Sequence, residues 1–125
     1  MKSLFIVFIG GGGGCVMRYV LSQYITCKII KSFFYGTFAV NILGCLLIGV
    51  ILTLSDKSDL LSQNQKLLLA TGFCGGFTTF STFIYESKTL IKSGDIVTAL
   101  WYTMFSVLVG FLAVLLGVYI AKYIQ

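Results

Sequence analysis

The chain has 125 residues, of which 58% are hydrophobic and 10% are charged, and its mean hydropathy is +0.98. Soluble domains carry about 25% charged residues, so this composition excludes a cytosolic enzyme, a nucleic-acid-binding protein and a disulfide-stapled secreted module. The chain has no histidine and only four acidic residues, which excludes most side-chain metal sites and most acid–base catalysis. These features predict an integral membrane protein embedded in a lipid bilayer.

Four apolar segments are long enough to cross a bilayer as helices, each of which needs about 20 mainly apolar residues. They are residues 4–25, 33–54, 67–85 and 96–123. Polar connections separate them at residues 26–32, 55–66 and 86–95. An even number of crossings places both chain ends on the same side of the membrane. We therefore predict a single all-α membrane domain, residues 1–125, of four transmembrane helices.

Two of these spans contain runs of glycine. Gly10–Gly14 in the first span has the spacing at which membrane helices pack closely, and packing alone explains this run. In the third span, Gly75 and Gly76 precede Thr78 and Thr79 at mid-membrane depth, where unpaired backbone is tolerated only inside protein or beside a cavity. Interrupted helices of this kind commonly build ion sites from freed backbone groups. The pattern predicts a break in the third helix.

The nine basic residues are divided almost evenly between the two sides of the membrane. Lys2, Lys57, Lys66 and Lys122 lie on the side of the chain ends, and the other four lysines lie on the opposite side, with Arg18 toward that end of the first span. A protein with one fixed orientation normally shows a clear Lys/Arg excess on its cytoplasmic side. The balance favours insertion in both orientations, and hence an antiparallel dimer; the alternative is that another signal steers translocation.

Polar side chains form stripes on three of the predicted helices. Thr37 and Asn41 lie one turn apart on the second span, and Tyr102 and Ser106 lie one turn apart on the fourth. The third span adds three hydroxyls and two aromatic rings, namely Thr79, Ser81, Thr82, Phe80 and Phe83. The simplest interpretation of a single hydroxyl is a bond to its own backbone, and that of the two phenylalanines is packing. Three converging stripes favour a polar path.

An anion suits such a path better than a cation. The stripes offer amide and hydroxyl donors, and the rings of Phe80 and Phe83 have positive edges. A cation path would need carboxylates, and the four acidic residues are expected in or beside the connections, at Asp56, Asp59, Glu86 and Asp95. Arg18 and the helix break are the candidate positive elements.

Three blocks of the sequence resemble the signature blocks of the Fluc/CrcB fluoride channel family: GGGGGCVMRY, GTFAVNILGCLLIG and GFCGGFTTFSTF. The length and the four-span layout are similar as well, so the resemblance covers essentially the whole chain. One minor departure is Cys15, where alanine is common. The resemblance implies a fluoride-selective channel of the bacterial cytoplasmic (inner) membrane, which exports fluoride passively and confers fluoride resistance. It also implies an antiparallel, dual-topology dimer, and the balanced charge favours a homodimer over pairing with a sibling chain.

The resemblance also implies roles for single residues. With Thr37 added from the stripe on the second span, the expected fluoride pathway comprises Thr37, Asn41, Phe80, Ser81, Thr82, Phe83, Tyr102 and Ser106. A structural Na⁺ at the dimer centre would be held by the backbone carbonyls of Gly75 and Thr78. Arg18 would have a structural or electrostatic role. Fluoride is small and tightly hydrated, so a pore must replace its water with several donors at close range.

Two other functions fit a small four-span protein less well. A small multidrug transporter needs a membrane-embedded carboxylate in its first span, and residues 4–25 contain no Asp or Glu. A non-transporting membrane scaffold subunit would explain the glycines, but not Asn41, the expected helix break and the hydroxyl stripes together. Neither an enzymatic activity nor a nucleic-acid partner is expected.

Overall fold

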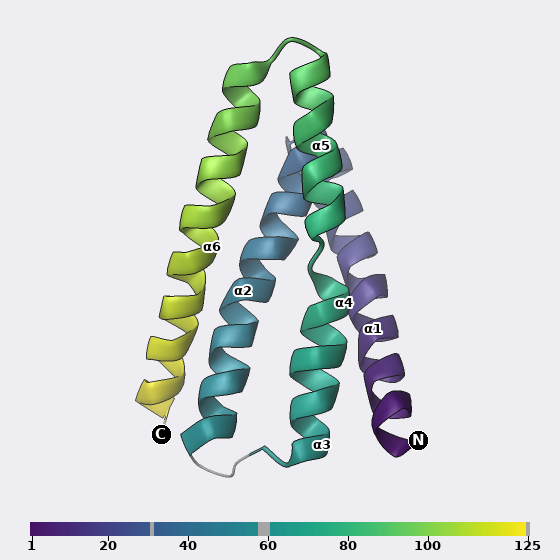
Figure 1. The fold of residues 1–125 in the computed structure, drawn as a ribbon, viewed down its shortest axis with the longest axis vertical. Coiled ribbons are helices and arrows are strands. Elements are labelled where there is room, and N and C mark those ends of the chain that lie inside the picture. Colours follow the sequence, from purple (N-terminus) through teal and green to yellow (C-terminus); the bar gives the residue numbers. More distant parts are fainter. Residues whose placement is uncertain (31, 58–60, 125) are drawn as a thin grey trace.

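The computed structural model of the protein describes residues 1–30, 32–57 and 61–124, and the regular elements in these ranges are all helical. Helix α1 (Lys2–Tyr24) continues into a π-helical segment, η1 (Ile25–Ile30). The next element is helix α2 (Phe33–Lys57). The third crossing is assembled from α3 (Gln63–Lys66), the π-helical η2 (Leu67–Cys74), α4 (Gly75–Phe77) and α5 (Phe80–Lys92). Helix α6 (Ile96–Ile124) comes last, and both chain ends lie at the same end of the bundle (Figure 1).

Four helical stretches of the described chain are long and apolar enough to cross a membrane, which confirms the predicted number of spans. They are Lys2–Lys28, Phe33–Asp56, Gln63–Lys92 and Ile96–Ile124. Many of their large apolar side chains point away from the bundle; Phe8 is 76% exposed and Phe111 is 63% exposed. Such a surface suits hydrocarbon and not water. The fold is therefore that of a multi-pass membrane protein.

Small residues bring α2 and α6 into close contact. A Cβ atom added at Gly49 would clash with the backbone carbonyl of Val114, and one added at Gly117 would clash with the carbonyl of Leu46. The two helices therefore touch backbone to backbone along this seam. In a bilayer, where burial of apolar surface drives helix association only weakly, this close approach supplies the packing contacts that hold spans together.

The five-glycine run of α1 is used in the same way, but only on one face. Gly10 and Gly14 are buried against η2, and a Cβ at either position would clash with backbone oxygens of that segment. Gly12 and Gly13 are exposed, and a Cβ there would meet nothing within 4 Å. The packing interpretation thus accounts for the two ends of the run and not for its middle.

The third crossing is longer than the sequence predicts. The sequence analysis ends the third span at residue 85 and begins a polar connection at residue 86. Both boundaries are wrong, because α5 continues to Lys92. Only Ser93, Gly94 and Asp95 join α5 to α6. Gly94 has a φ of +86°, and the amide of Asp95 donates to the Leu90 carbonyl, an arrangement that closes a helix C-terminus. The Asp95 carboxylate then accepts from the amide of Thr98 at the start of α6.

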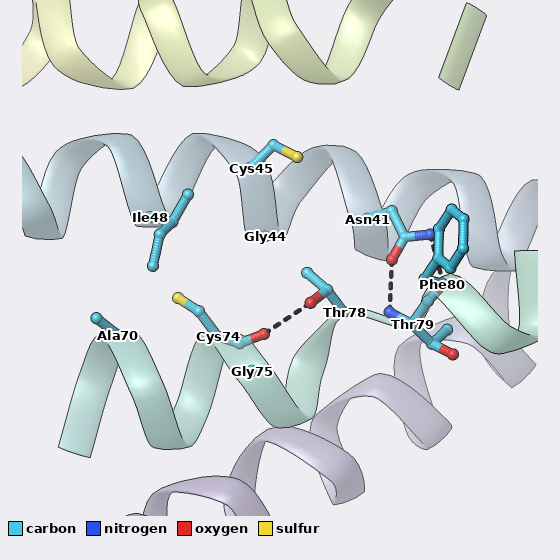
Figure 2. Close-up of a pocket in the computed structure, with 10 residues that line it drawn as sticks. All are labelled: Asn41, Gly44, Cys45, Ile48, Ala70, Cys74, Gly75, Thr78, Thr79 and Phe80. Atoms are coloured by element: carbon cyan, nitrogen blue, oxygen red, sulfur yellow. Dashed lines mark hydrogen bonds between the residues drawn. The ribbon is translucent and has the colours of Figure 1, made fainter. Parts of the chain in front are cut away.

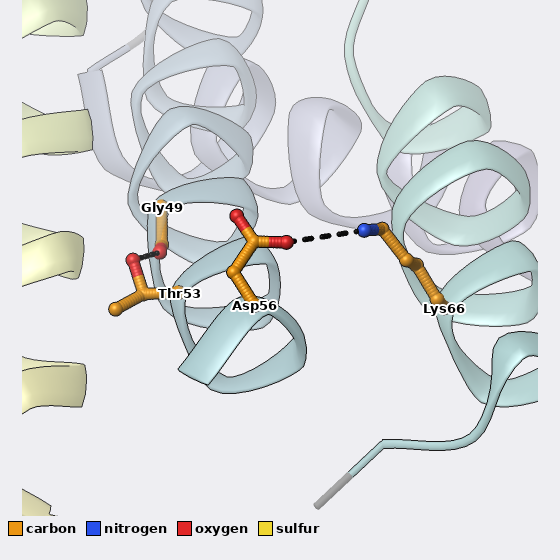
Figure 3. A network of polar contacts seen from close by, with 4 residues as sticks. All are labelled: Gly49, Thr53, Asp56 and Lys66. Carbon is orange, nitrogen blue, oxygen red and sulfur yellow. Dashed lines mark hydrogen bonds and ion pairs between the residues drawn. The ribbon is translucent and has the colours of Figure 1, made fainter. Parts of the chain in front are cut away.

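The connection between α2 and α3 is held by charged side chains at its two ends. Lys66 Nζ lies 3.3 Å from Asp56 Oδ1, so an ion pair joins the last turn of α2 to α3 (Figure 3). Both side chains are partly exposed, and such pairs contribute about 0–1 kcal/mol to stability. Asp59 and Lys31, which the sequence places in the connections, lie outside the described residues.

Candidate functional site

Two residues with extended backbone separate α4 from α5. Thr78 has φ −91° and ψ 159°, and Thr79 has φ −151° and ψ 115°. Thr78 stays attached to the preceding segment, since its amide and its hydroxyl both donate to the Cys74 carbonyl, at 3.1 and 3.0 Å. Thr79 belongs to the following helix, because its hydroxyl oxygen accepts from the amide of Thr82 at 3.2 Å and caps α5. Figure 1 shows the interruption midway along the crossing.

Asn41 on α2 holds this interrupted backbone in place. Its Oδ1 accepts from the amide of Thr79 at 2.7 Å, and its Nδ2 donates to the carbonyl of Thr79 at 3.0 Å. Figure 2 shows the side chain directed at Thr79 from the neighbouring helix. One side-chain amide thus satisfies both backbone polar groups of an extended residue in the middle of a membrane span, where leaving either unpaired would cost several kcal/mol.

A cavity of about 370 Å³ lies beside this junction, between α2 and the third crossing. Of the residues that the sequence analysis singled out, Asn41, Gly75, Thr78 and Phe80 line it. The remaining lining residues are Gly44, Cys45, Ile48, Ala70, Cys74 and Thr79 (Figure 2). The expected cation-binding carbonyls and the expected pore asparagine therefore lie at one place in the fold.

A second, more polar cavity of about 240 Å³ lies between α1, α2 and the start of α5. It brings together Arg18, Thr37, Thr79 and Thr82. The hydroxyls there are linked, since Thr79 Oγ1 lies 3.0 Å from Thr82 Oγ1 and 3.3 Å from Ser81 Oγ. Five of the lining side chains carry hydroxyls, including Tyr19 and Ser22, so the cavity offers hydrogen-bond donors beside one positive charge.

The positive charge of Arg18 is half-buried and is directed toward the helix interruption. Its Nη1 donates to the Thr78 carbonyl at 3.4 Å, and its Nη2 lies 3.7 Å from Cys15 Sγ. The guanidinium therefore contacts one of the two carbonyls that the sequence analysis assigns to a cation. It also favours negative charge in the second cavity, whose wall it forms.

A carboxylate that the sequence analysis places in a connection lies instead inside the bundle. Glu86 is only 7% exposed. Its two oxygens accept from the hydroxyl of Thr37 at 2.7 Å and from the hydroxyl of Tyr102 at 2.8 Å. The expected position of Glu86 is therefore wrong, because α5 runs past it. The spacing offered one signal, since Glu86 follows Phe83 by three residues and so shares its helix face.

This carboxylate changes what two of the expected pathway residues can do. A hydroxyl has one proton to donate, and Thr37 and Tyr102 both direct theirs at Glu86. In this arrangement their oxygens remain as acceptors only. The hydroxyl of Ser106 differs, because it is buried and has no hydrogen-bond partner among the described residues. Within the described part of the chain, Ser106 therefore has a hydroxyl proton that is not already committed to another group.

The two phenylalanines lie side by side but in different surroundings. Their ring centroids are 5.8 Å apart. Phe83 is 6% exposed and meets the ring of Tyr102 edge to face, with centroids 5.0 Å apart. Phe80 is 75% exposed and lines the larger cavity. Packing within the chain thus explains the position of Phe83. It does not explain that of Phe80, which lies on an open face beside the polar residues of the first cavity.

Comparison with known proteins gives matches over nearly the whole chain. Residues 5–118 match the family described as "CrcB-like protein, Camphor Resistance (CrcB)". The chain is 48% identical over 122 residues to the "Fluoride-specific ion channel FluC" of Phocaeicola vulgatus, covering 98% of this chain and 100% of the relative. Proteins of the same name from Gloeothece citriformis and Bacteroides fragilis are each 43% identical, and 98% of both chains is covered in each case.

Proposed function

The chain belongs to the CrcB-like protein family, and on that premise we propose that it is a fluoride-selective ion channel and not an enzyme. The observation that carries the proposal is the 48% identity, over 98% of this chain, to a relative named as a fluoride-specific ion channel. The channel would export fluoride passively across the bacterial cytoplasmic membrane and so confer fluoride resistance. Neither a multidrug transporter nor a scaffold subunit is favoured by the names of the relatives.

We propose that fluoride follows the polar groups around the helix interruption. The proposed pathway residues are Thr37, Asn41, Phe80, Ser81, Thr82, Phe83, Tyr102 and Ser106. Of these, Thr37 and Tyr102 would border the path by holding Glu86 and would not donate to the ion. Support comes from the linked hydroxyls of Ser81 and Thr82, from the unpartnered hydroxyl of Ser106, and from the nearby charge of Arg18. The positive edges of the two rings would replace water around the ion where hydroxyls are absent.

We propose that the working unit is an antiparallel homodimer with one structural Na⁺ at its centre, held by the carbonyls of Gly75 and Thr78. The residues present fit a cation: both carbonyls adjoin an interruption of the helix, and unwound backbone carbonyls coordinate Na⁺ in other membrane proteins. When bound, Na⁺ would supply the positive charge that stabilises carbonyl oxygens of two subunits close together. The open face at Gly75 and Phe80 is where a second subunit would pack.

Reporter fusions test the proposed dual topology. Fusions active on only one side of the membrane, placed at the C-terminus, should report both orientations at comparable levels when no sibling chain is present. A strongly one-sided result from a functional protein would contradict the antiparallel homodimer. The channel function itself is tested by fluoride efflux from liposomes, for which the decisive comparison is release of fluoride without release of chloride.

A further inference from the structure

The two carbonyls proposed to bind the cation share a property that follows from the hydrogen bonds around them. In a continued helix, the Gly75 carbonyl would accept from the amide of Thr79, and the Thr78 carbonyl would accept from the amide of Thr82. Neither amide is available. The Thr79 amide donates to Asn41 Oδ1, and the Thr82 amide donates to Thr79 Oγ1.

Each diversion is made by a side chain with good geometry. The 2.7 Å bond from the Thr79 amide to Asn41 is reinforced by the 3.0 Å bond that Asn41 returns to the Thr79 carbonyl. Thr79 is 8% exposed; its hydroxyl donates a hydrogen bond to Thr82 Oγ1 at 3.0 Å, and its oxygen accepts one from the Thr82 amide. The two diversions are consecutive, since Asn41 fixes the residue whose hydroxyl makes the second.

We infer that Asn41 and Thr79 are positioning residues for the cation site, which they create by removing the helical donors of the Gly75 and Thr78 carbonyls. This inference rests on the proposed cation site and assigns Asn41 a second role besides the fluoride pathway. The two residues do not touch the cation themselves. The acceptor oxygen of Asn41 is the atom that matters for this role, whereas its amide NH₂ serves only to hold the Thr79 carbonyl.

Arg18 is the other group that faces this site from a neighbouring helix. Its guanidinium takes one lone pair of the Thr78 carbonyl at 3.4 Å and leaves the second lone pair for another partner. Among the described residues, no side chain donates a hydrogen bond to the Gly75 carbonyl. The property that both carbonyls share is therefore the loss of the helical amide donor, and contact with Arg18 is not shared.

The test measures Na⁺-dependent stability of the purified protein, a readout that is independent of fluoride flux. Melting temperature and dimer retention in detergent are followed while Na⁺ replaces N-methylglucamine at constant ionic strength. Two variants remove a donor or acceptor that diverts a helical amide, Asn41→Leu and Thr79→Val, and they are called the removing variants. The conservative variant is Thr79→Ser, which retains the capping hydroxyl.

We expect the removing variants to need about 10–100-fold more Na⁺ for half-maximal stabilisation, as is typical when groups that orient metal ligands are lost. The conservative variant Thr79→Ser should stay close to the wild-type value. Thr103→Val is the matched control, because the hydroxyl of Thr103 lies on the exposed face of α6 and bonds only its own helix backbone. If Asn41→Leu does not purify as a folded helical protein, Asn41→Ala replaces it and Thr79→Val carries the same test.

Two results would overturn the inference: wild-type Na⁺ dependence in both removing variants, or no Na⁺ dependence in the wild-type protein. Failure of the positioning role can be distinguished from failure of the proposed channel function. A wild-type protein that binds Na⁺ in the expected manner but releases no fluoride would refute the channel and leave the positioning role intact. Fluoride release without any Na⁺ dependence would refute the positioning role alone.

Discussion

The side-chain amide of Asn41 pairs with both backbone polar groups of Thr79, accepting from its N–H at 2.7 Å and donating to its carbonyl at 3.0 Å. This pair joins α2 to the point where the third crossing is interrupted. Thr79 lines both cavities beside the interruption, and Asn41 lines the larger of the two. Substitutions at Asn41 can therefore affect both cation binding and anion passage, and the two effects are measured separately.

Asn41→Asp is predicted to stop fluoride flux, even in protein that still purifies in a folded state. The new carboxylate keeps the acceptor for the Thr79 amide but places a negative charge beside the path of an anion. Repulsion between like charges at such range costs several kcal/mol in a partly desolvated site. Efflux and Na⁺-dependent melting are measured on the same preparation. Retained flux in Asn41→Asp would show that the side chain does not face the ion.

Phe80→Ile and Phe83→Ile are predicted to abolish fluoride flux, with different effects on stability. Phe80 is 75% exposed within one subunit, so its replacement should leave the packing inside that subunit unchanged, and any loss of stability should come from the proposed dimer contact. Phe83 is buried against Tyr102, and an apolar swap there should cost up to about 1.5 kcal/mol. Flux is compared at matched protein density in liposomes. Near-normal efflux from both variants would show that the rings serve only in packing.

Removing one of the hydroxyls that hold Glu86 is predicted to destabilise the fold. Thr37→Val and Tyr102→Phe each leave one oxygen of a buried carboxylate without its donor, which costs about 1–3 kcal/mol. Thr89→Val serves as the control, because the Thr89 hydroxyl is exposed and bonds only the Tyr85 carbonyl of its own helix. Thermal unfolding in detergent gives the comparison. Equal stability of all three variants would mean that Glu86 is not held by these hydroxyls.

The glycine run of α1 allows a comparison within a single helix turn. Gly14→Ala is predicted to destabilise the protein by about 1–3 kcal/mol, because the new methyl group would meet the backbone of η2. Gly12→Ala should be neutral or stabilising by up to about 1 kcal/mol, since it adds helix propensity in open space. Melting of the purified variants distinguishes them. A Gly12→Ala protein that is as unstable as Gly14→Ala would indicate a contact that one subunit does not contain.

The number of crossings follows from apolar length alone, and the sequence therefore predicts that number correctly, although it ends the third crossing too early. The burial of Glu86 cannot be predicted from the sequence in this way, because it depends on Thr37 and Tyr102, which lie 49 and 16 residues away along the chain. A polar stretch that begins with Glu-Ser-Lys at residues 86–88 is indistinguishable from a loop until its partners on α2 and α6 are known. Similarly, the sequence identifies Asn41 as a buried polar residue, but only the fold shows that its amide is paired with the backbone of Thr79.

The channel assignment is tested most directly by ion efflux from liposomes that contain the purified protein. Vesicles are loaded with equal concentrations of fluoride and chloride, and an ionophore dissipates the membrane potential so that flux is limited by the protein. We predict rapid fluoride release with no chloride release, without a proton gradient, and loss of this release in Phe80→Ile. Fluoride retention by vesicles that contain folded wild-type protein, or equal release of fluoride and chloride, would contradict the assignment.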